Sequence, residues 1–494
     1  MTVATNRLTA DMPFDLAGKF LELEREFGLF DLNIDGTPVW WFMRTRAFSL
    51  LHRKLSGMNL RANADSLGLL GSIRIGLRSL PYVLRRKETR TDILAVSTAS
   101  ARRHITEDGL AFDVFFDFLS YMPGVDYAVL EFPDRGPHSV RPYSRKVLYG
   151  DGMSLAGNVH RLASRFQPLG KVALEISERL VGVSQALGIA VDPREARKLV
   201  AREIAFSGTL VRLARRLLDH ANPRVLIVES ASDPSHMAVQ FAAKERGVPV
   251  VEMQHGLISV DSPAFFFDLP RGIAARRIPF PDVMLVFGEY FKRVLTLRPS
   301  VSSERVIPVG YPYLWLEYQR WQQKQSVSGA RGDAILITSQ PGLGAFWSEF
   351  AVQLSRLVKQ PIIIKPHPAE ADKVQTVFGT AMKCGRVEVI KDSRSLYDLF
   401  PLACYHLSVS STSHLEAIAF GLKDIIVTMR GIEKYVDFLR DRGLPTASTP
   451  EDVADLVASY PDISSIVRFV REEVFCLHKN PIHEVAEVLR SLET

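Results

Sequence analysis

Residues 362–370 read IIIKPHPAE, and residues 408–421 read SVSSTSHLEAIAFG. The first segment is an apolar strand that ends abruptly in KPHP. The second is a short strand followed by four hydroxyl residues that open a helix. Because the carboxyl ends of parallel strands meet at one sheet edge, where open α/β sheets bind ligands, the two turns are expected to be neighbours. An imidazole, a cation, hydroxyls and free backbone N–H groups favour phosphate, so a phosphorylated or nucleotide-linked ligand is predicted.

Strands and helices alternate on both sides of these segments. Apolar strands are predicted at 93–97, 127–131, 225–229, 249–253 and 283–287, and then at 334–338, 361–365, 387–390, 406–409 and 424–428. Helical periodicity separates them, most clearly at 194–220 and 235–246. This rhythm predicts parallel sheets covered by helices on both faces. The fold class predicted is therefore α/β, with two Rossmann-like doubly wound domains.

The domain organisation follows from the length and from one polar stretch. A chain of 494 residues is too long for one ordinary core. Residues 1–91 are expected to form a helical N-terminal extension, 92–322 the first Rossmann-like domain, and 333–494 the second domain with C-terminal helices. Residues 322–332, QQKQSVSGARG, have no apolar periodicity and are predicted to be the linker.

The composition excludes several classes of protein. An apolar content of 47% with 23% charged residues is that of a globular protein. No run of eighteen uncharged apolar residues predicts a membrane-spanning helix, and the N-terminus lacks the layout of a secretory signal. The 3 cysteines lie far apart without a CxxC pair, which argues against a disulfide frame or a zinc site. A reducing cytoplasm is the expected location.

The net charge of +6 is mildly basic, and part of it is concentrated in one segment. Residues 69–87 place leucines and isoleucines at helical spacing with arginines alongside. Such a helix can lie on an anionic membrane surface. It can equally pack on a domain with its arginines extended to solvent, as surface helices generally do. Both interpretations stay open.

The candidate phosphate site is drawn from the two turns. His367 stands between two prolines that stiffen its backbone, and a preorganised imidazole can donate to a phosphate oxygen. The alternative is a structural histidine bonded to a loop carbonyl. One hydroxyl of 410–413 is expected to cap the helix, with Glu416 completing a capping box. The nucleotide- and phosphate-binding candidates are Lys365, His367, Pro368, Ser410, Ser411, Thr412, Ser413, Glu416 and Gln340, the last preceding the turn at 342–344.

Transfer of a group to a hydroxyl needs a proton acceptor. Glu229 and Asp233 flank the end of a strand, Asp108 lies in the loop after the first strand, and His255 lies in the QHG turn at 254–256. These four are the catalytic candidates, although each is also explained as a helix cap, a solvated carboxylate or a surface turn. No P-loop, HExxH, GxSxG or DxD pattern is present, so no metal is expected.

The motifs QHG (254–256), GYP (310–312), KPHP (365–368) and SSTSHLEA (410–417) together resemble a known family. They are similar to those of GT-B glycosyltransferases of bacterial surface polysaccharide synthesis, namely capsule and lipopolysaccharide Kdo transferases, bacterial sialyltransferases and teichoic-acid polymerases. The resemblance covers roughly residues 92–430. It implies that His367 with Ser411 and Thr412 holds the phosphate of a cytidine nucleotide while Lys365 adds charge. The 107–109 sequence EDG is similar to the acidic motif that supplies the base in sialyltransferases.

Departures from the teichoic-type pattern weaken that branch of the resemblance. Those polymerases have a tryptophan before the HG and an aspartate after the serine pair, where this chain has Gln254 and the pair Glu416-Ala417. The resemblance therefore implies a cytoplasmic transferase that moves a sugar, such as CMP-activated Kdo or sialic acid, to a bacterial cell-surface polysaccharide or glycolipid.

The expected partners are a nucleotide-sugar donor, a glycan or lipid-linked glycan acceptor and, through residues 69–87, an anionic inner membrane. No cofactor and no nucleic acid are expected. The alternatives are a CDP-polyol phosphotransferase of the teichoic-acid type, a UDP-sugar 2-epimerase, and a glycan- or membrane-binding protein without activity.

Overall fold

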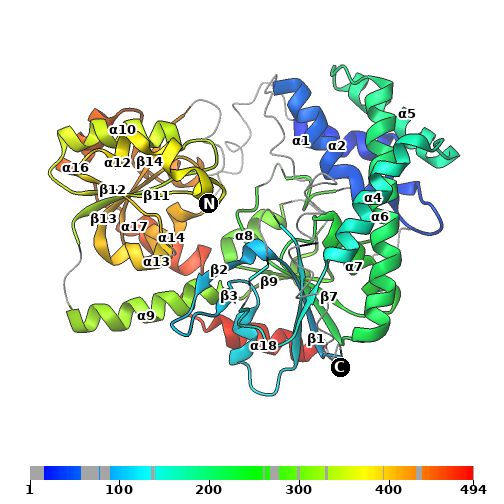
Figure 1. Cartoon of the computed structure of the whole chain (residues 1–494), viewed down its shortest axis with the longest axis horizontal. Coiled ribbons are helices and arrows are strands. Elements are labelled where there is room, and N and C mark those ends of the chain that lie inside the picture. The colour runs from blue at the N-terminus through cyan, green and yellow to red at the C-terminus, as the bar shows by residue number, and fades with distance from the viewer. Residues whose placement is uncertain are drawn as a thin grey trace, which may run out of the picture. The chain divides into compact units, whose positions relative to one another are not determined.

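The computed structural model describes residues 16–56, 77, 90–134, 138–139, 141–259, 262–267, 278–297, 301–328, 332–392, 394–429 and 437–492. The chain divides into two compact units (Figure 1). Unit 1 comprises Met1–Val286, Lys292–Ile307 and Val485–Thr494, and unit 2 comprises Phe287–Phe291 and Pro308–Glu484.

Unit 1 is built on a seven-stranded sheet with the order β5-β4-β1-β6-β7-β8-β9. Its strands are β1 (Ile93–Thr98), β4 (Tyr127–Phe132), β5 (Val147–Tyr149), β6 (Val225–Val228), β7 (Val250–Met253), β8 (Val283–Val286) and β9 (Val306–Pro308). The chain runs outward from β1 to β5 and then returns to β6 on the other side of β1, where it pairs in parallel. The point where the direction of winding reverses, between β1 and β6, is where such sheets bind ligands. A short antiparallel hairpin, β2 (Arg102–Ile105) and β3 (Ala111–Asp113), follows β1.

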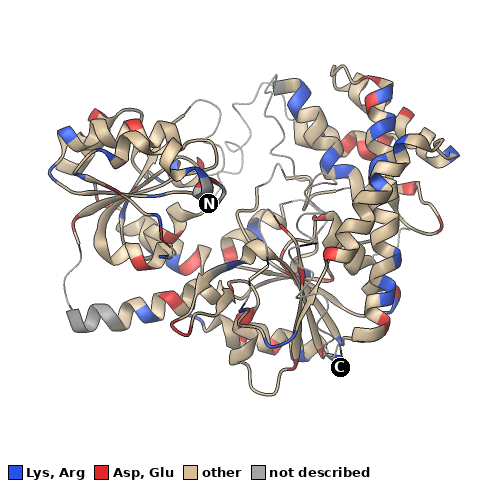
Figure 2. Cartoon of the chain, in the orientation of Figure 1, with Lys and Arg blue, Asp and Glu red and all other residues tan. Residues whose placement is uncertain are grey.

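The helices assigned to unit 1 alone are α1 (Leu16–Glu26), α2 (Val39–Ser56), α4 (Asp151–Ala163), α5 (Lys171–Ala186), α6 (Pro193–Ala221) and α7 (Pro234–Glu245). The helix α6 begins where the Asp192 side chain accepts from the Arg194 N–H, and it ends at Asn222, whose φ of 42° is left-handed. Its apolar stripe packs against α4, α5 and α7, whereas lysines and arginines recur on its surface (Figure 2).

Unit 2 has a six-stranded parallel sheet with the order β12-β11-β10-β13-β14-β15. Its strands are β10 (Ala334–Thr338), β11 (Ile362–Lys365), β12 (Val387–Val389), β13 (Ala403–Ser408), β14 (Lys423–Val427) and β15 (Thr446–Ala447). Here the winding reverses between β10 and β13. The register pairs Thr338 with Lys365 on one side and Ile337 with Leu407 on the other, so three strands end at one level.

Helices cover both faces of this sheet. The described α-helices of unit 2 are α9 (Pro312–Ser328), α10 (Gly344–Leu357), α11 (Val374–Val377), α12 (Gly379–Met382), α13 (Leu396–Leu399), α14 (Ser413–Ala419), α15 (Asp437–Arg440), α16 (Pro450–Ala458) and α17 (Ser464–Phe469). Figure 1 shows α10, α12 and α16 on one face and α13, α14 and α17 on the other. Trp347 of α10 and Phe378 are fully buried in the core beneath the first face. Among the described residues the remaining α-helices are α8 (Glu289–Leu295) and α18 (Pro481–Leu492).

The fold class predicted from the sequence is confirmed. Helices α1 and α2 precede two Rossmann-like, doubly wound parallel sheets, the GT-B class of architecture. Residues 322–332, predicted to be the linker, are helical as far as Ser328, because their glutamines and lysine are good helix formers and extend α9. The segment 69–87 lies outside the described residues except for Leu77. Among the described helices none is both long and apolar enough to cross a bilayer.

Candidate functional site

The carboxyl ends of β10 and β13 meet in a cluster of hydroxyl groups. Thr338 ends β10, and its Oγ1 lies 2.8 Å from Ser413 Oγ and 3.0 Å from Ser408 Oγ. The Ser408 hydroxyl donates to the Thr338 carbonyl at 2.9 Å and accepts from Gln340 Nε2 at 2.6 Å. Residues some 70 positions apart are therefore joined at the point where the winding of the sheet reverses, the usual ligand position in such a fold.

The four hydroxyls predicted at 410–413 divide into two pairs. Ser411 Oγ accepts from the Ser413 N–H at 3.2 Å, where α14 begins, and Ser413 Oγ bonds Thr338. The predicted capping is therefore not observed as expected, because Ser411 stands one residue before the N-cap position, Thr412, whose side chain makes no capping bond. Ser410 Oγ is buried without a hydrogen-bond partner among the described residues, and the half-buried Thr412 side chain acts as no helix cap. Ser410 and Thr412 therefore remain the hydroxyls best placed to serve a ligand.

The KPHP turn follows β11 at the same sheet edge. His367 is half-buried, Pro366 is buried and Pro368 is exposed, and the His367 carbonyl accepts from the Glu370 N–H at 2.8 Å. Lys365 Nζ donates to the backbone carbonyls of Asp392 and Arg394, and burial lowers its pKa. Its ammonium is therefore engaged by the loop before α13, whereas the imidazole stands in a turn that the prolines stiffen.

A buried carboxylate already occupies the turn at 342–344. Glu370 Oε1 accepts from the N–H groups of Gly342, at 3.1 Å, and Gly344, at 3.2 Å, while Oε2 accepts from Ser339 Oγ at 2.9 Å. Gly342 has a φ of 85°, which suits glycine. Because α10 begins at Gly344, the carboxylate lies at the positive end of that helix. The N–H groups of Gly342 and Gly344 are therefore bonded within the protein and are not offered to a phosphate.

Glu416, predicted to complete a capping box, has a different partner. Its side chain accepts a hydrogen bond from the buried Tyr397 phenol, whose pKa burial and this carboxylate raise well above its usual value. Gln340, the last of the predicted binding residues, points its amide N–H at Ser408 and leaves Oε1 buried without a hydrogen-bond partner among the described residues.

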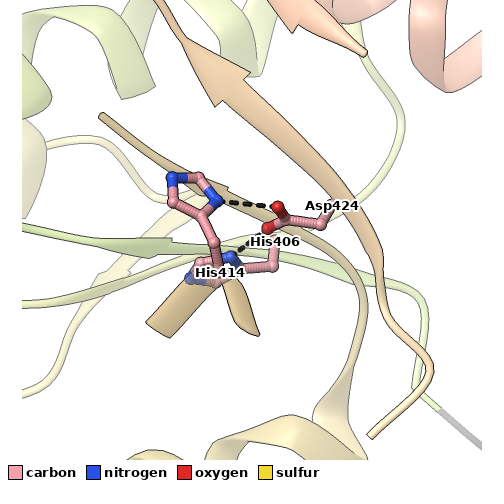
Figure 3. Close-up of side chains that lie close together, drawn as sticks. All are labelled: His406, His414 and Asp424. Carbon is pink, nitrogen blue, oxygen red and sulfur yellow. Dashed lines mark hydrogen bonds and ion pairs between the residues drawn. The ribbon is translucent and has the colours of Figure 1, made fainter. Parts of the chain in front are cut away.

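Behind the hydroxyl cluster lies a group that the sequence did not indicate. Asp424, the second residue of β14, stands between His406 and His414 (Figure 3). Its Oδ1 contacts His406 Nδ1, and its Oδ2 lies 2.7 Å from His414 Nδ1. His406 Nε2 is 3.0 Å from Thr338 Oγ1. All three members of the group are fully buried.

This group is the one set of three among the described residues whose ligand atoms lie close enough to hold a metal ion, all within 4.8 Å of one another. Structural zinc sites have four protein ligands, and catalytic sites keep a position open to solvent. Asp424, His406 and His414 offer neither a fourth ligand nor exposure. The arrangement fits hydrogen bonding better than metal binding.

In unit 1, Glu229 is the catalytic candidate that lies at the reversal of winding. It follows β6 directly, and its Oε1 accepts from Thr98 N at 3.0 Å and from Thr98 Oγ1 at 2.8 Å. Thr98 ends β1, so one carboxylate joins the two strand ends, and only 5% of Glu229 is exposed. A carboxylate at this position is placed to accept a proton from a ligand bound over the sheet edge.

The other catalytic candidates have different settings. Asp233 caps α7, because its Oδ1 accepts from Ser235 N at 2.8 Å and His236 N at 3.4 Å. Asp108 is exposed at the tip of the β2–β3 hairpin. His255 is exposed after β7, and its ring meets the edge of Phe115 with centroids 6.4 Å apart.

The hairpin that carries Asp108 is fastened by a buried ionic network. Arg102 bonds Glu131 and, at 3.3 Å, Asp117. His138 contacts Glu131 and lies 2.6 Å from Asp151. Although burial lowers the pKa of His138, its bonds to these two carboxylates raise it to about 9. The network holds the hairpin on the sheet, and its charged groups are paired with one another.

A further buried carboxyl, Glu252 in β7, was missed by the sequence analysis. Its Oε1 accepts from the Ala231 N–H at 3.0 Å, and Oε2 is buried without a hydrogen-bond partner among the described residues. Burial raises the pKa of Glu252 to about 8. The signal was present in the sequence: Glu252 interrupts the apolar run PVVEM, and Thr338 likewise ends AILIT with a hydroxyl.

Comparisons with known proteins show distant structural likeness alone. No family model and no curated protein match the sequence. Among solved structures the chain is similar to the UDP-GlcNAc 2-epimerase of Neisseria meningitidis bound to UDP-GlcNAc, with 12% identity over 81% of this chain and 99% of that chain and a TM-score of 0.46.

Two other solved structures are similar to the same extent. The UDP-N-acetylglucosamine 2-epimerase of Rickettsia bellii has 16% identity over 82% of this chain and 95% of that chain, with a TM-score of 0.42. The wall teichoic acid polymerase TagF has 9% identity over 91% of this chain and 98% of that chain, with a TM-score of 0.44. At these values neither substrate nor residue roles carry over to this chain.

Proposed function

We propose that the chain is a metal-independent glycosyltransferase of the GT-B class that transfers a sugar from a nucleotide donor to a cell-surface glycan or glycolipid. One observation carries the proposal: Thr338, Ser408, Ser413 and Gln340 converge where the winding of the unit 2 sheet reverses. Uncommitted polar groups stand beside them, namely Ser410 Oγ and Gln340 Oε1. Ligands of doubly wound sheets bind at this position.

Departure of the nucleotide builds negative charge on phosphate, and stabilising that charge is the main task of such a site. In our proposal His367 donates to the phosphate from the rigid KPHP turn, and Ser410 and Thr412 add hydroxyl donors from the turn before α14. Lys365, held by loop carbonyls, has a supporting role at most. In the proposal these donors carry the task without a metal or a cofactor.

In the proposal Glu229 is the base that takes the proton from the hydroxyl of the acceptor. It is the carboxylate among the predicted candidates that lies at the strand ends β1 and β6 of unit 1. If the configuration of the sugar is retained, the same carboxylate is instead the proposed nucleophile: it displaces the nucleotide, the acceptor oxygen then displaces it, and the phosphate of the departing nucleotide takes the proton of the acceptor hydroxyl. Asp233 is less suited, because it caps the start of α7 and does not join the ends of β1 and β6.

The cytidine nucleotide in the proposal rests on the likeness of KPHP and SSTSHLEA to the motifs of Kdo and sialyltransferases. A CMP-activated sugar acid is accordingly the proposed donor, and a bacterial surface polysaccharide or glycolipid at the inner membrane face is the proposed acceptor. Nucleotide identity separates this proposal from its alternatives more sharply than any other single property.

The test is a calorimetric titration of the whole chain with CMP, CDP, UDP and GDP. We expect CMP to bind, and His367→Ala to weaken CMP binding by about tenfold to a hundredfold, the effect of removing a hydrogen bond to a charged group. The control is His220→Ala, which removes an exposed histidine at the end of α6 and should leave the affinity unchanged.

Three results would decide against the proposal. If His367→Ala binds CMP as tightly as the wild type, His367 does not bind the phosphate and the proposed site is wrong. Turnover of CDP-glycerol in preference to CMP-sugars identifies a polyol phosphotransferase. Interconversion of a UDP-sugar without any acceptor identifies an epimerase.

A further inference from the structure

The buried group behind the hydroxyl cluster closes into a ring. Asp424 bonds His406, His406 bonds Thr338 at 3.0 Å, and Thr338 lies 2.8 Å from Ser413. Ser413 is followed in the chain by His414, which returns to Asp424 at 2.7 Å. The ring joins β10, β13, β14 and the first turn of α14, which are the elements that carry the proposed donor site.

The direction of the hydrogen bonds around the ring follows from the number of protons. An ionised carboxylate only accepts, so both imidazoles direct Nδ1–H at Asp424. A neutral His406 then has a lone pair on Nε2, and burial lowers its pKa, which favours the neutral form. The single proton of Thr338 faces His406 Nε2 and Ser408 Oγ.

The Thr338 hydroxyl also contacts Ser413, and the proton of that hydrogen bond must therefore come from Ser413. Ser413 donates to Thr338 Oγ1, and its own proton is directed inward, away from any ligand. The position of Ser413 is thus fixed, and this restrains the preceding residues, 410–412. The Gln340 amide is fixed by the same cluster, because the proton of Ser408 is given to the Thr338 carbonyl and Ser408 can only accept from Gln340.

We infer that Asp424, His406 and Thr338 are positioning residues of the donor site: through Ser413 and Ser408 they fix the turn 410–412 and the Gln340 amide against the bound nucleotide phosphate. This inference rests on the proposed function. None of the three touches the ligand in this account. Preorganised donors lose little entropy on binding. Loosening the turn should therefore weaken nucleotide binding even though the ligand-contacting residues themselves are not substituted.

A divalent metal at the same place is the competing explanation. A metal bound through the two Nδ1 atoms would need their lone pairs, whereas in the ring these atoms carry the protons that meet separate oxygens of Asp424. It would also leave a net positive charge among fully buried side chains with a single carboxylate to offset it. The ring satisfies both carboxylate oxygens without an ion.

The test compares Thr338→Val, which removes the hydroxyl with little change of volume, with Thr338→Ser, which keeps it. We expect Thr338→Val to weaken CMP binding at least tenfold and Thr338→Ser to stay within about threefold of the wild type. The control, Ser348→Ala, removes a buried hydrogen bond to Ala381 N (3.0 Å) elsewhere in unit 2. It should lower the unfolding midpoint yet leave CMP affinity unchanged.

Equal CMP affinity in the wild type and Thr338→Val would overturn the inference while the proposed function stands. Weakening by Ser348→Ala to the same degree would also overturn it, because the effect would then reflect stability alone. If the wild type binds no nucleotide, the positioning role falls together with the proposed function.

A second measurement needs no ligand. In ¹⁵N-histidine spectra, with Asp424→Asn as the reference, His406 should be neutral with its proton on Nδ1 between pH 6 and 8. A neutral His406 with its proton on Nε2 would refute the ring. So would one equivalent of tightly bound zinc in the purified wild type that Asp424→Asn lacks.

Discussion

Replacing Glu252 by glutamine should change how the stability of unit 1 depends on pH. Glu252 is 2% exposed, a single backbone N–H faces its carboxyl, and burial raises its pKa to about 8 from the ordinary 4.5. Between these values the folded chain keeps a proton that the unfolded chain has released. Stability contributed by this group is therefore full below pH 4.5 and is lost as the pH rises through 8. Glutamine, which is neutral throughout, lacks this dependence.

The size of the effect follows from the two pKa values. Where the folded form is protonated and the unfolded form is not, the free energy of unfolding falls by about 1.4 kcal/mol per pH unit. Integrated from pH 5.5 to 7.5, with the flattening near pH 8 included, the loss is about 2.5 kcal/mol. All other titrating groups are common to both chains and cancel in the difference between wild type and Glu252→Gln.

The assay is urea unfolding of both chains at pH 5.5 and pH 7.5. Circular dichroism follows the unfolding of the whole chain, and Trp40 and Trp41, both buried in unit 1, contribute the signal of that unit to the fluorescence. We expect Glu252→Gln to gain about 2 to 3 kcal/mol relative to the wild type on going from the lower to the higher pH. A relative gain below about 0.5 kcal/mol would show that Glu252 is ionised in the folded chain and would refute the reasoning.

Two further substitutions test the construction of unit 2. Trp347→Ala removes a fully buried ring that packs on Phe350 (centroids 5.5 Å apart) and should cost about 3 to 5 kcal/mol in chemical denaturation; a loss below about 1 kcal/mol would contradict the core described for this unit. Glu370→Gln takes away the charge that accepts from Gly342, Gly344 and Ser339, and should lower the free energy of unfolding by about 1 to 3 kcal/mol and speed amide exchange at 342–344. Unchanged exchange there would show that the carboxylate does not hold the turn.

Local sequence determined the strands and the chemistry at their ends. The run AILIT was predicted as a strand at 334–338, which is β10 as observed, and the strand before KPHP was placed within one residue. Period and apolarity suffice for this, because a strand buried on both faces must be apolar throughout. The sequence also placed His367 and the hydroxyls 410–413 at one sheet edge, since the carboxyl ends of a parallel sheet share it. The strands that they follow, β11 and β13, are however not neighbours, because β10 lies between them.

What each of these groups does was decided by partners far away in the chain. Thr338 and His406 are separated by 68 residues, Lys365 is engaged by carbonyls at 392 and 394, and Glu370 fills the turn at 342–344. Such pairings depend on which strands become neighbours and in what register. Periodicity within one segment carries no information about that, because hydrogen bonds between strand ends form only after the sheet is assembled. The sequence by itself determined which polar groups reach the sheet edge, and the tertiary structure alone decided with which partners they bond.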